Sequence, residues 1–406
     1  RAKFAMSLTP FTGNFTQQES ISDSAIMAAT EVLRSGRLHR YNTAEGEVSQ
    51  TAQLETEYAA WQGSKYCLAC TSGGYALSTA LKAAGLESGE QVLTNSFTLA
   101  PVPGAIVNAG GQPVFVEVTN NLVIDLEDLE AKAKSSGARF FMLSHMRGHL
   151  ADMDRIIDIV TAHNLILIED CAHTMGALWD GKRSGNFGHA SCFSTQTYKH
   201  VNSGEGGFIT SDSPELMARA ILLSGSYMLY ERHGASPDPS VFSTIRLQTP
   251  NCSGRMDNLR AAILRPQLAE LESNVSRWNE RYSTIEKKLR EVSSVQVPVR
   301  PQKETYVGSS FQFLIPGISD ADARQFVQAN KALGVELKWF GDHEPNGYTS
   351  NHKSWQYTNL QSLPATDEVL AGLFDIRIPL TFSLQNCEHL AAIIAHCAQS
   401  LLNKAA

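Results

Sequence analysis

Between residues 60 and 215, short apolar runs alternate with longer segments whose apolar residues recur at helical spacing. This alternation is typical of βαβ units, in which a helix crosses from one parallel strand to the next. Several runs are almost continuously apolar, as in strands that are covered on both faces. We therefore predict an α/β fold with a doubly wound, mostly parallel, seven-stranded sheet. The expected strands are residues 66–70, 91–94, 113–118, 139–143, 165–169, 190–194 and 207–210, with helices over 75–84 and 152–163.

The second half of the chain has a different pattern. A long amphipathic stretch covers residues 256–292, and Pro266 is expected to interrupt or kink it. Strands over 310–315 and 376–379 and a final helix over 387–402 indicate a smaller α+β domain. We predict an N-terminal arm (1–20), a large cofactor-binding domain (21–265), and a linker helix with the small C-terminal domain (266–406).

Composition excludes several classes of protein. The 406 residues carry a formal net charge of -7, with 34 basic and 41 acidic residues mixed along the chain, so we expect no nucleic-acid partner. No apolar run reaches the ~20 residues that span a bilayer, and the first six residues, Arg1 to Met6, lack a hydrophobic signal region. Seven cysteines, an odd number, argue against a disulfide framework. We predict a cytoplasmic protein with reduced thiols and no membrane partner.

Two short motifs resemble metal sites. Cys67 and Cys70 form a single CxxC within an apolar run, without a second cysteine pair, and are predicted to be buried structural thiols. His145 and His149 lie four residues apart, but the glutamate of an HExxH motif is missing and Gly148 weakens a helix there. We therefore predict no metal site.

A lysine and an aspartate suggest cofactor chemistry. Asp170 ends the apolar run 165–170, and Lys199 precedes the glycine cluster 204–207. Pyridoxal phosphate needs such a pair, because a lysine forms a Schiff base with its aldehyde and a carboxylate keeps its pyridine nitrogen protonated. From spacing alone, a plainer interpretation is equally open: Asp170 caps a helix and Lys199 is a surface lysine.

A possible phosphate site lies in the turn Thr71-Ser72-Gly73-Gly74, between a predicted strand and a predicted helix. A helix N-terminus offers free backbone N–H groups to an anion. Ser194, at the end of another predicted strand, adds a hydroxyl group. The turn matches neither a GxGxxG nor a P-loop fingerprint, so nucleotide cofactors have little support.

Several ordered segments across nearly the whole length resemble the DegT/DnrJ/EryC1/StrS family of pyridoxal phosphate aminotransferases, a branch of the fold-type-I (aspartate aminotransferase-like) superfamily. The resemblance implies Lys199 as the Schiff-base lysine, Asp170 as the partner of the pyridine nitrogen and His173 against the ring. It also implies that Ser72, Gly73, Gly74 and Ser194 bind the phosphate and that Leu99 covers the ring. The segments that carry it are 110–118, His145 with Gly148 and 151–154, 168–173, 185–188, 192–194, Lys199 with 204–207, and Arg255-Met256 with 261–262 and 267–268.

Four positions depart from the family's usual residues. Gly74 replaces a common Thr, Leu99 an aromatic ring, Arg147 a frequent Tyr and Ser253 a common Asn. As a hypothesis, the fork of Arg147 binds a carboxylate or phosphate of the substrate, although an arginine paired with an acidic residue such as Asp152 explains it equally well. Further substrate candidates are Ser253 and, in the polar loop 36–50, His39 and Tyr41.

The resemblance implies an aminotransferase that moves an amino group from glutamate or glutamine to a keto-sugar, often nucleotide-linked, or to a keto-cyclitol of secondary metabolism. It also implies a homodimer with shared active sites. Some relatives have histidine instead of the lysine and act as dehydratases, but here His200 follows a retained Lys199. Two alternatives remain: elimination, decarboxylation or carbon–carbon bond chemistry with the same cofactor, and a non-catalytic regulatory protein on this fold.

Overall fold

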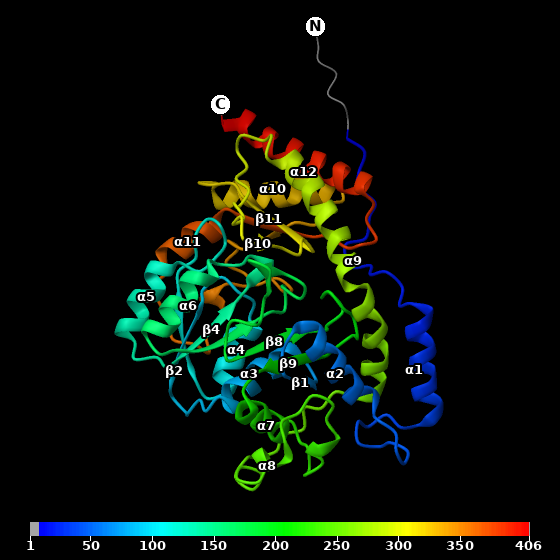
Figure 1. The fold of residues 1–406 in the computed structure, drawn as a ribbon. Helices are drawn as coiled ribbons and strands as arrows, with labels where there is room; N and C mark the ends of the chain where they lie inside the picture. Colours follow the sequence, from blue (N-terminus) through cyan, green and yellow to red (C-terminus); the bar gives the residue numbers. More distant parts are fainter. Residues whose placement is uncertain (1–7, 406) are drawn as a thin grey trace.

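The computed structural model describes residues 8–405, so Arg1 to Met6 and the first part of the predicted N-terminal arm lie outside the described residues. A large α/β part surrounds a seven-stranded sheet, and a smaller part contains a three-stranded sheet. Figure 1 shows the long helix α9 (Asn258–Leu289) running alongside the large part and reaching the small one. Among the described residues, no helix is both long enough and apolar enough to cross a membrane.

All seven predicted strands of the large sheet are observed, with ends that differ by no more than two residues. Strand β9 is antiparallel to both of its neighbours, whereas the other pairs that lie next to each other are parallel. The mostly parallel mixed sheet is therefore confirmed. Its order is β1 (Tyr66–Cys70), β9 (Gly207–Ser211), β8 (Ala190–Ser194), β5 (Ile166–Asp170), β4 (Phe140–Ser144), β2 (Gln91–Asn95) and β3 (Gln112–Val116).

Helices cover both faces of this sheet, which explains its continuously apolar strands. One buried cluster joins α3 (Gly73–Ala83), α4 (Pro101–Asn108) and α7 (Pro214–Leu223) to alternate strand residues such as Phe140. The opposite cluster joins α5 (Leu126–Ser135) and α6 (Met153–Ala162) to residues such as Phe141. Asp152 caps α6, because its side chain accepts the N–H groups of Asp154 and Arg155.

The predicted interruption at Pro266 is wrong, because α9 continues through this proline as one helix of 32 residues. The kink that was predicted as the other outcome stays a prediction. A proline removes one backbone donor from a helix interior. The packing of α9 against other helices outweighs that local loss; these are α1 (Asp23–Ser35), α2 (Gln50–Gln62) and α12 (Leu384–Ala405). The helix therefore ties the two parts of the chain together.

The small sheet has the antiparallel order β11-β13-β12. The predicted strand over 376–379 is wrong in its bounds: β13 ends at Arg377, before Pro379, which has no N–H group for a sheet. The sheet and its covering helices are β11 (Ser310–Leu314), β12 (Lys338–Trp339), β13 (Leu373–Arg377), α10 (Asp320–Ala332) and α11 (Pro364–Ala371). Short elements elsewhere are α8 (Pro239–Phe242), β6 (Leu178–Trp179), β7 (Lys182–Arg183) and β10 (Glu304–Thr305).

Candidate active site

The carboxyl ends of three neighbouring strands place polar side chains at one edge of the large sheet. Ser144 ends β4, Asp170 ends β5 and Ser194 ends β8. Ligands of open α/β sheets collect at such an edge. A cavity of about 370 Å³ opens there, and Ser194 and Lys199 belong to its lining. Asp170 lines a smaller adjoining pocket that also includes Lys199.

Lys199 lies in the loop after β8, and its Nζ atom is 2.9 Å from Nε2 of His173. The pKa of the Lys199 amine is lowered to about 7, first by burial and then by the nearby guanidinium of Arg147, whereas the carboxylate of Asp170 acts to raise it. An amine with such a pKa is neutral in a large fraction of molecules at physiological pH. Lys199 can therefore act as a nucleophile and as a base.

The hydrogen bonds of His173 support a neutral Lys199. The backbone N–H of Arg147 donates to Nδ1 of His173 at 3.0 Å, so Nδ1 accepts and a neutral ring carries its proton on Nε2. Burial and the charge of Lys199 hold the pKa of His173 well below its usual value. The Nε2–H group then donates to the lone pair of the Lys199 amine. Arg147 itself has a left-handed backbone conformation, with φ 55°.

This arrangement makes a pH prediction for the cofactor-free protein. Acylation of the Lys199 amine is expected to have its midpoint near pH 7, because only the neutral amine reacts. Lys303 is the matched control, since its exposed amine pairs with Asp154, which raises its pKa above the ordinary 10.5. Mass spectrometry of lysine modification across pH measures both. A Lys199 midpoint as high as that of Lys303 would contradict the assignment.

Asp170 is buried, and its carboxylate is oriented by two donors. Oδ2 accepts from the hydroxyl of Ser144 at 2.9 Å, and Oδ1 accepts from the backbone N–H of Ala172 at 3.1 Å. Thr98 holds the Ser144 hydroxyl in turn, at 2.8 Å. No helix begins at Asp170, and no basic side chain that the structure describes forms an ion pair with it. The helix-cap interpretation is therefore wrong, and the carboxylate is free to pair with a cationic ligand.

The turn before α3 forms a cradle for an anion. Ser72 caps the helix by accepting the N–H of Tyr75, so Gly73 and Gly74 occupy its first turn. A Cβ atom at Gly73 would lie 2.9 Å from Cβ of Ser194, whereas one at Gly74 would meet only Pro101 at 3.9 Å. The absence of a side chain at Gly73 therefore lets the helix N-terminus approach the Ser194 hydroxyl. Free N–H groups, a helix dipole and a hydroxyl suit a phosphate.

Arg147 lines the cavity but is already paired. Its guanidinium lies 3.0 Å from the carboxylate of Asp375, which is buried. The acidic partner is therefore Asp375 and not Asp152, which caps α6. Leu99 also lines the cavity, where an aliphatic side chain can cover a planar ligand. Whether Arg147 binds substrate stays a prediction.

Three other predicted residues lie elsewhere in this chain. Tyr41 is buried, and its hydroxyl bonds to Nε2 of His233 at 2.7 Å. The hydroxyl of Ser253 accepts a hydrogen bond from the guanidinium of Arg255. Partial burial and the charge of Arg255 lower the pKa of His39. None of His39, Tyr41 and Ser253 lines the Lys199 cavity. Their contact with a substrate remains a prediction that requires a second subunit.

Sequence reasoning missed two cations of the same cavity, Lys338 and Arg377. Arg377 lies at the end of β13 and stacks its guanidinium over Tyr198, 3.7 Å from the ring centroid. One signal was available: Arg377 interrupts the apolar run Ile376 to Leu380, an unusual place for a charge.

The side chains of the histidine and cysteine motifs lie in the protein interior, where they contact other parts of the fold. His145 bonds through Nε2 to Glu169 at 3.0 Å, whereas His149 bonds to Gln312 at 2.7 Å. The predicted burial of Cys67 and Cys70 is confirmed. Burial raises the pKa of both thiols, as expected for unreactive cysteines.

Comparison with known proteins gives one family over most of the chain. The sequence model of the DegT/DnrJ/EryC1/StrS aminotransferase family matches residues 19–395. An L-glutamine:2-deoxy-scyllo-inosose aminotransferase of Streptomyces kanamyceticus is 27% identical, over 78% of this chain and 74% of that protein. A GDP-perosamine synthase of Caulobacter vibrioides is 31% identical, over 58% of this chain and 61% of that protein.

The extent of these matches varies. The aligned part covers 41% of the length of one further curated relative and 65% of the length of another. Among solved structures, 3-amino-5-hydroxybenzoic acid synthase superposes with a TM-score of 0.81 at 23% identity, over 95% of this chain and 99% of that one. The fold is thus that of the fold-type-I aminotransferases, as predicted.

Proposed function

Because the chain belongs to the DegT/DnrJ/EryC1/StrS aminotransferase family, we propose that it is a pyridoxal 5'-phosphate-dependent aminotransferase. Its donor is glutamate or glutamine, and its acceptor is a keto-sugar or a keto-cyclitol. Relatives named for both acceptor classes support this range. The observation that carries the proposal is Lys199, a lysine with a pKa of about 7, in a cavity next to the free carboxylate of Asp170.

The residues present fit the cofactor. Asp170 would hold the ring nitrogen, His173 and Leu99 would enclose the ring, and Ser194 with the backbone of Gly73 and Gly74 would hold the phosphate. When bound, pyridoxal phosphate supplies an electron sink and carries the amino group between the two substrates. Lys199 would hold the cofactor aldehyde, and its amine would move a proton at the substrate's α-carbon once it is free. His173 would hold that free amine neutral through Nε2.

Other features distinguish this proposal from its alternatives. His200 is buried and bonds to the hydroxyl of Ser309, so it does not take the place of Lys199 as in the dehydratases. A regulatory protein needs no lysine with a lowered pKa facing a free carboxylate. We further propose a homodimer, in which His39, Tyr41 and Ser253 reach the partner's site.

The phosphate cradle gives a prediction about cofactor affinity. Gly73→Ala is expected to weaken pyridoxal phosphate binding by about tenfold or more, because the added Cβ would force Ser194 away from the helix N-terminus. Gly74→Ala is the matched control and should change affinity less than threefold, since space is available there. Equilibrium dialysis measures both dissociation constants. Equal effects of the two substitutions would argue against a phosphate at this turn.

The visible absorption spectrum of the cofactor-loaded protein tests the proposed function itself. Protein saturated with pyridoxal phosphate is expected to show a visible absorption band that changes when glutamate or glutamine is added. Lys199→Ala cannot form a Schiff base with the cofactor, so its band should be shifted or lost after unbound cofactor is removed by gel filtration. A native protein that is colourless after the same treatment would contradict the proposal.

A further inference from the structure

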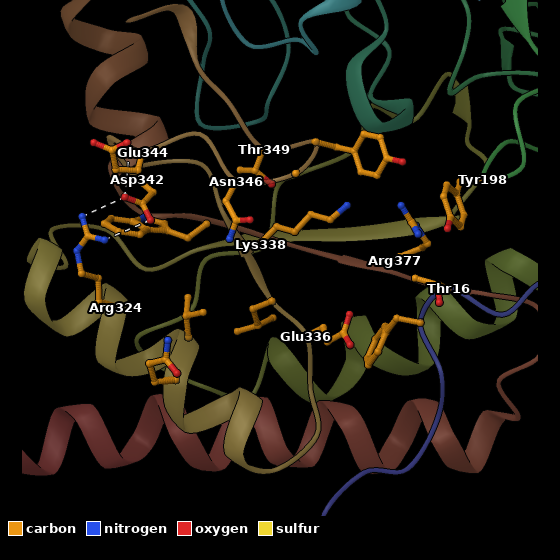
Figure 2. Close-up of a pocket in the computed structure, with 17 residues that line it drawn as sticks. Thr16, Tyr198, Arg324, Glu336, Lys338, Asp342, Glu344, Asn346, Thr349 and Arg377 are labelled. Atoms are coloured by element: carbon orange, nitrogen blue, oxygen red, sulfur yellow. Dashed lines mark hydrogen bonds and ion pairs between the residues drawn. The ribbon is translucent and has the colours of Figure 1, made fainter. Parts of the chain in front are cut away.

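A second cavity adjoins the Lys199 cavity. The outer cavity, of about 460 Å³, lies between α10, β12 and the segment that contains Phe15 and Thr16 (Figure 2). Four residues line both cavities and therefore lie where the two cavities meet. We call these four residues, Tyr198, Lys338, Tyr348 and Arg377, the throat.

The throat carries positive charge that ion pairs among the described residues do not neutralise. Among the described residues no carboxylate forms an ion pair with Arg377, and Lys338 has only Asp375 at 3.9 Å. That carboxylate already pairs with Arg147 at 3.0 Å and accepts from Gln312 at 2.7 Å. Figure 2 shows the charged ends of Lys338 and Arg377 on the same side of the cavity, with Glu336 on the other side.

The pKa shifts agree with this excess of charge. The pKa of Lys338 is lowered to about 8, mainly by burial. Arg147 and Arg377 contribute to this lowering, whereas the carboxylates of Asp375 and Glu336 oppose it. Burial and then Arg147 lower the pKa of Arg377. By contrast, Arg324 of the outer cavity has its own partner, Asp342, at 3.0 Å. Cations that are partly removed from water without a counter-ion favour an anionic ligand.

We propose that Arg377 and Lys338 bind an anionic group of the keto acceptor, a phosphate or a carboxylate, as the acceptor passes through the throat to Lys199. The planar fork of Arg377, held on Tyr198, suits a bidentate oxyanion, and Lys338 adds a point charge. The inference rests on the proposed aminotransferase function and narrows it. An acceptor with an anionic substituent is favoured over a neutral keto-cyclitol.

Calorimetric titration of the cofactor-loaded protein tests the throat with three probes. Inorganic pyrophosphate represents a phosphate ester, benzoate a carboxylate, and myo-inositol a neutral cyclitol. At least one anion is expected to bind more tightly than myo-inositol. The anion that binds more tightly then shows whether the acceptor carries a phosphate or a carboxylate. Arg377→Gln and Lys338→Gln should each weaken that anion at least tenfold, whereas Arg377→Lys should weaken it less. Tighter binding of myo-inositol, or anion binding that neither Gln substitution changes, would overturn the inference.

Two controls separate the possible causes. Arg324→Gln removes a paired cation of the outer cavity and should leave anion affinity within twofold. The second control is the rate of keto-acid formation from glutamate. This rate shows whether the cations of the throat bind the carboxylate of the donor instead of the acceptor. If Arg377→Gln and Lys338→Gln lower that rate by a larger factor than they lower anion affinity, the two cations bind the donor, and the inference is overturned. If the unmodified protein forms no keto acid at all, the proposed function fails, whatever the throat binds.

Discussion

Replacing Lys199 with alanine is expected to lower the turnover number for transamination by about 10²–10⁴-fold, the usual contribution of a positioned acid–base group. The loss has a structural basis: Nζ of Lys199 is the amine at 2.9 Å from His173 in the cavity, and its pKa of about 7 suits proton transfer at neutral pH. Steady-state rates with glutamate or glutamine as donor measure the effect.

Two further measurements give this result a specific meaning. Lys303→Ala removes an exposed lysine that pairs with Asp154, and its turnover number should match that of the unmodified protein within twofold. Adding methylamine to Lys199→Ala should restore part of the rate, because a free amine can move the same proton. Activity of Lys199→Ala within tenfold of the unmodified protein would show that another residue is the base.

Replacing Asp170 with asparagine is expected to lower the turnover number by about 10²–10³-fold, the effect of removing one preorganised electrostatic partner. The substitution keeps the shape of the side chain and its bond to Ser144, but removes the negative charge. A ring nitrogen opposite an amide is no longer held protonated, and the cofactor becomes a weaker electron sink. Single-turnover rates with saturating donor measure the chemical step.

A cofactor analogue that is methylated on its ring nitrogen tests the cause of this loss. Its permanent positive charge should restore much of the rate to Asp170→Asn. Asp152→Asn is the matched control: Asp152 caps α6 on the surface, so its substitution should alter stability by about 1 kcal/mol or less and leave the rate unchanged. Full activity of Asp170→Asn with ordinary cofactor would remove Asp170 from the proposed site.

The large sheet was predictable because each strand carries its own signal. Strands that are buried on both faces must be apolar throughout, so β1 and β8 match their predicted bounds. The carboxyl ends of parallel strands meet at one edge, so the proximity of Asp170 and Ser194 also followed from the sequence. The predicted interruption at Pro266 was wrong for a different reason. The helix propensity of the local sequence does not show that α1, α2 and α12 pack against α9 and hold it together.

The throat was not predictable, because it depends on contacts between distant parts of the chain. Tyr198 follows β8, whereas Lys338 and Arg377 belong to the small sheet, more than a hundred residues later. Arg147 was recognised as unusual, but its partner Asp375 lies 228 positions away. Charge compensation in a cavity is a tertiary property. Only the folded chain shows that Asp375 pairs with Arg147 and that no carboxylate of the described residues forms an ion pair with Arg377.

Transfer of an amino group at this site is tested most directly by a single turnover without acceptor. Protein saturated with pyridoxal phosphate and mixed with excess glutamate is expected to release one equivalent of keto acid per active site, while the visible band is lost. Little ammonia or carbon dioxide should appear. Release of ammonia or carbon dioxide in place of the keto acid, or no product from a protein that binds the cofactor, would contradict the account.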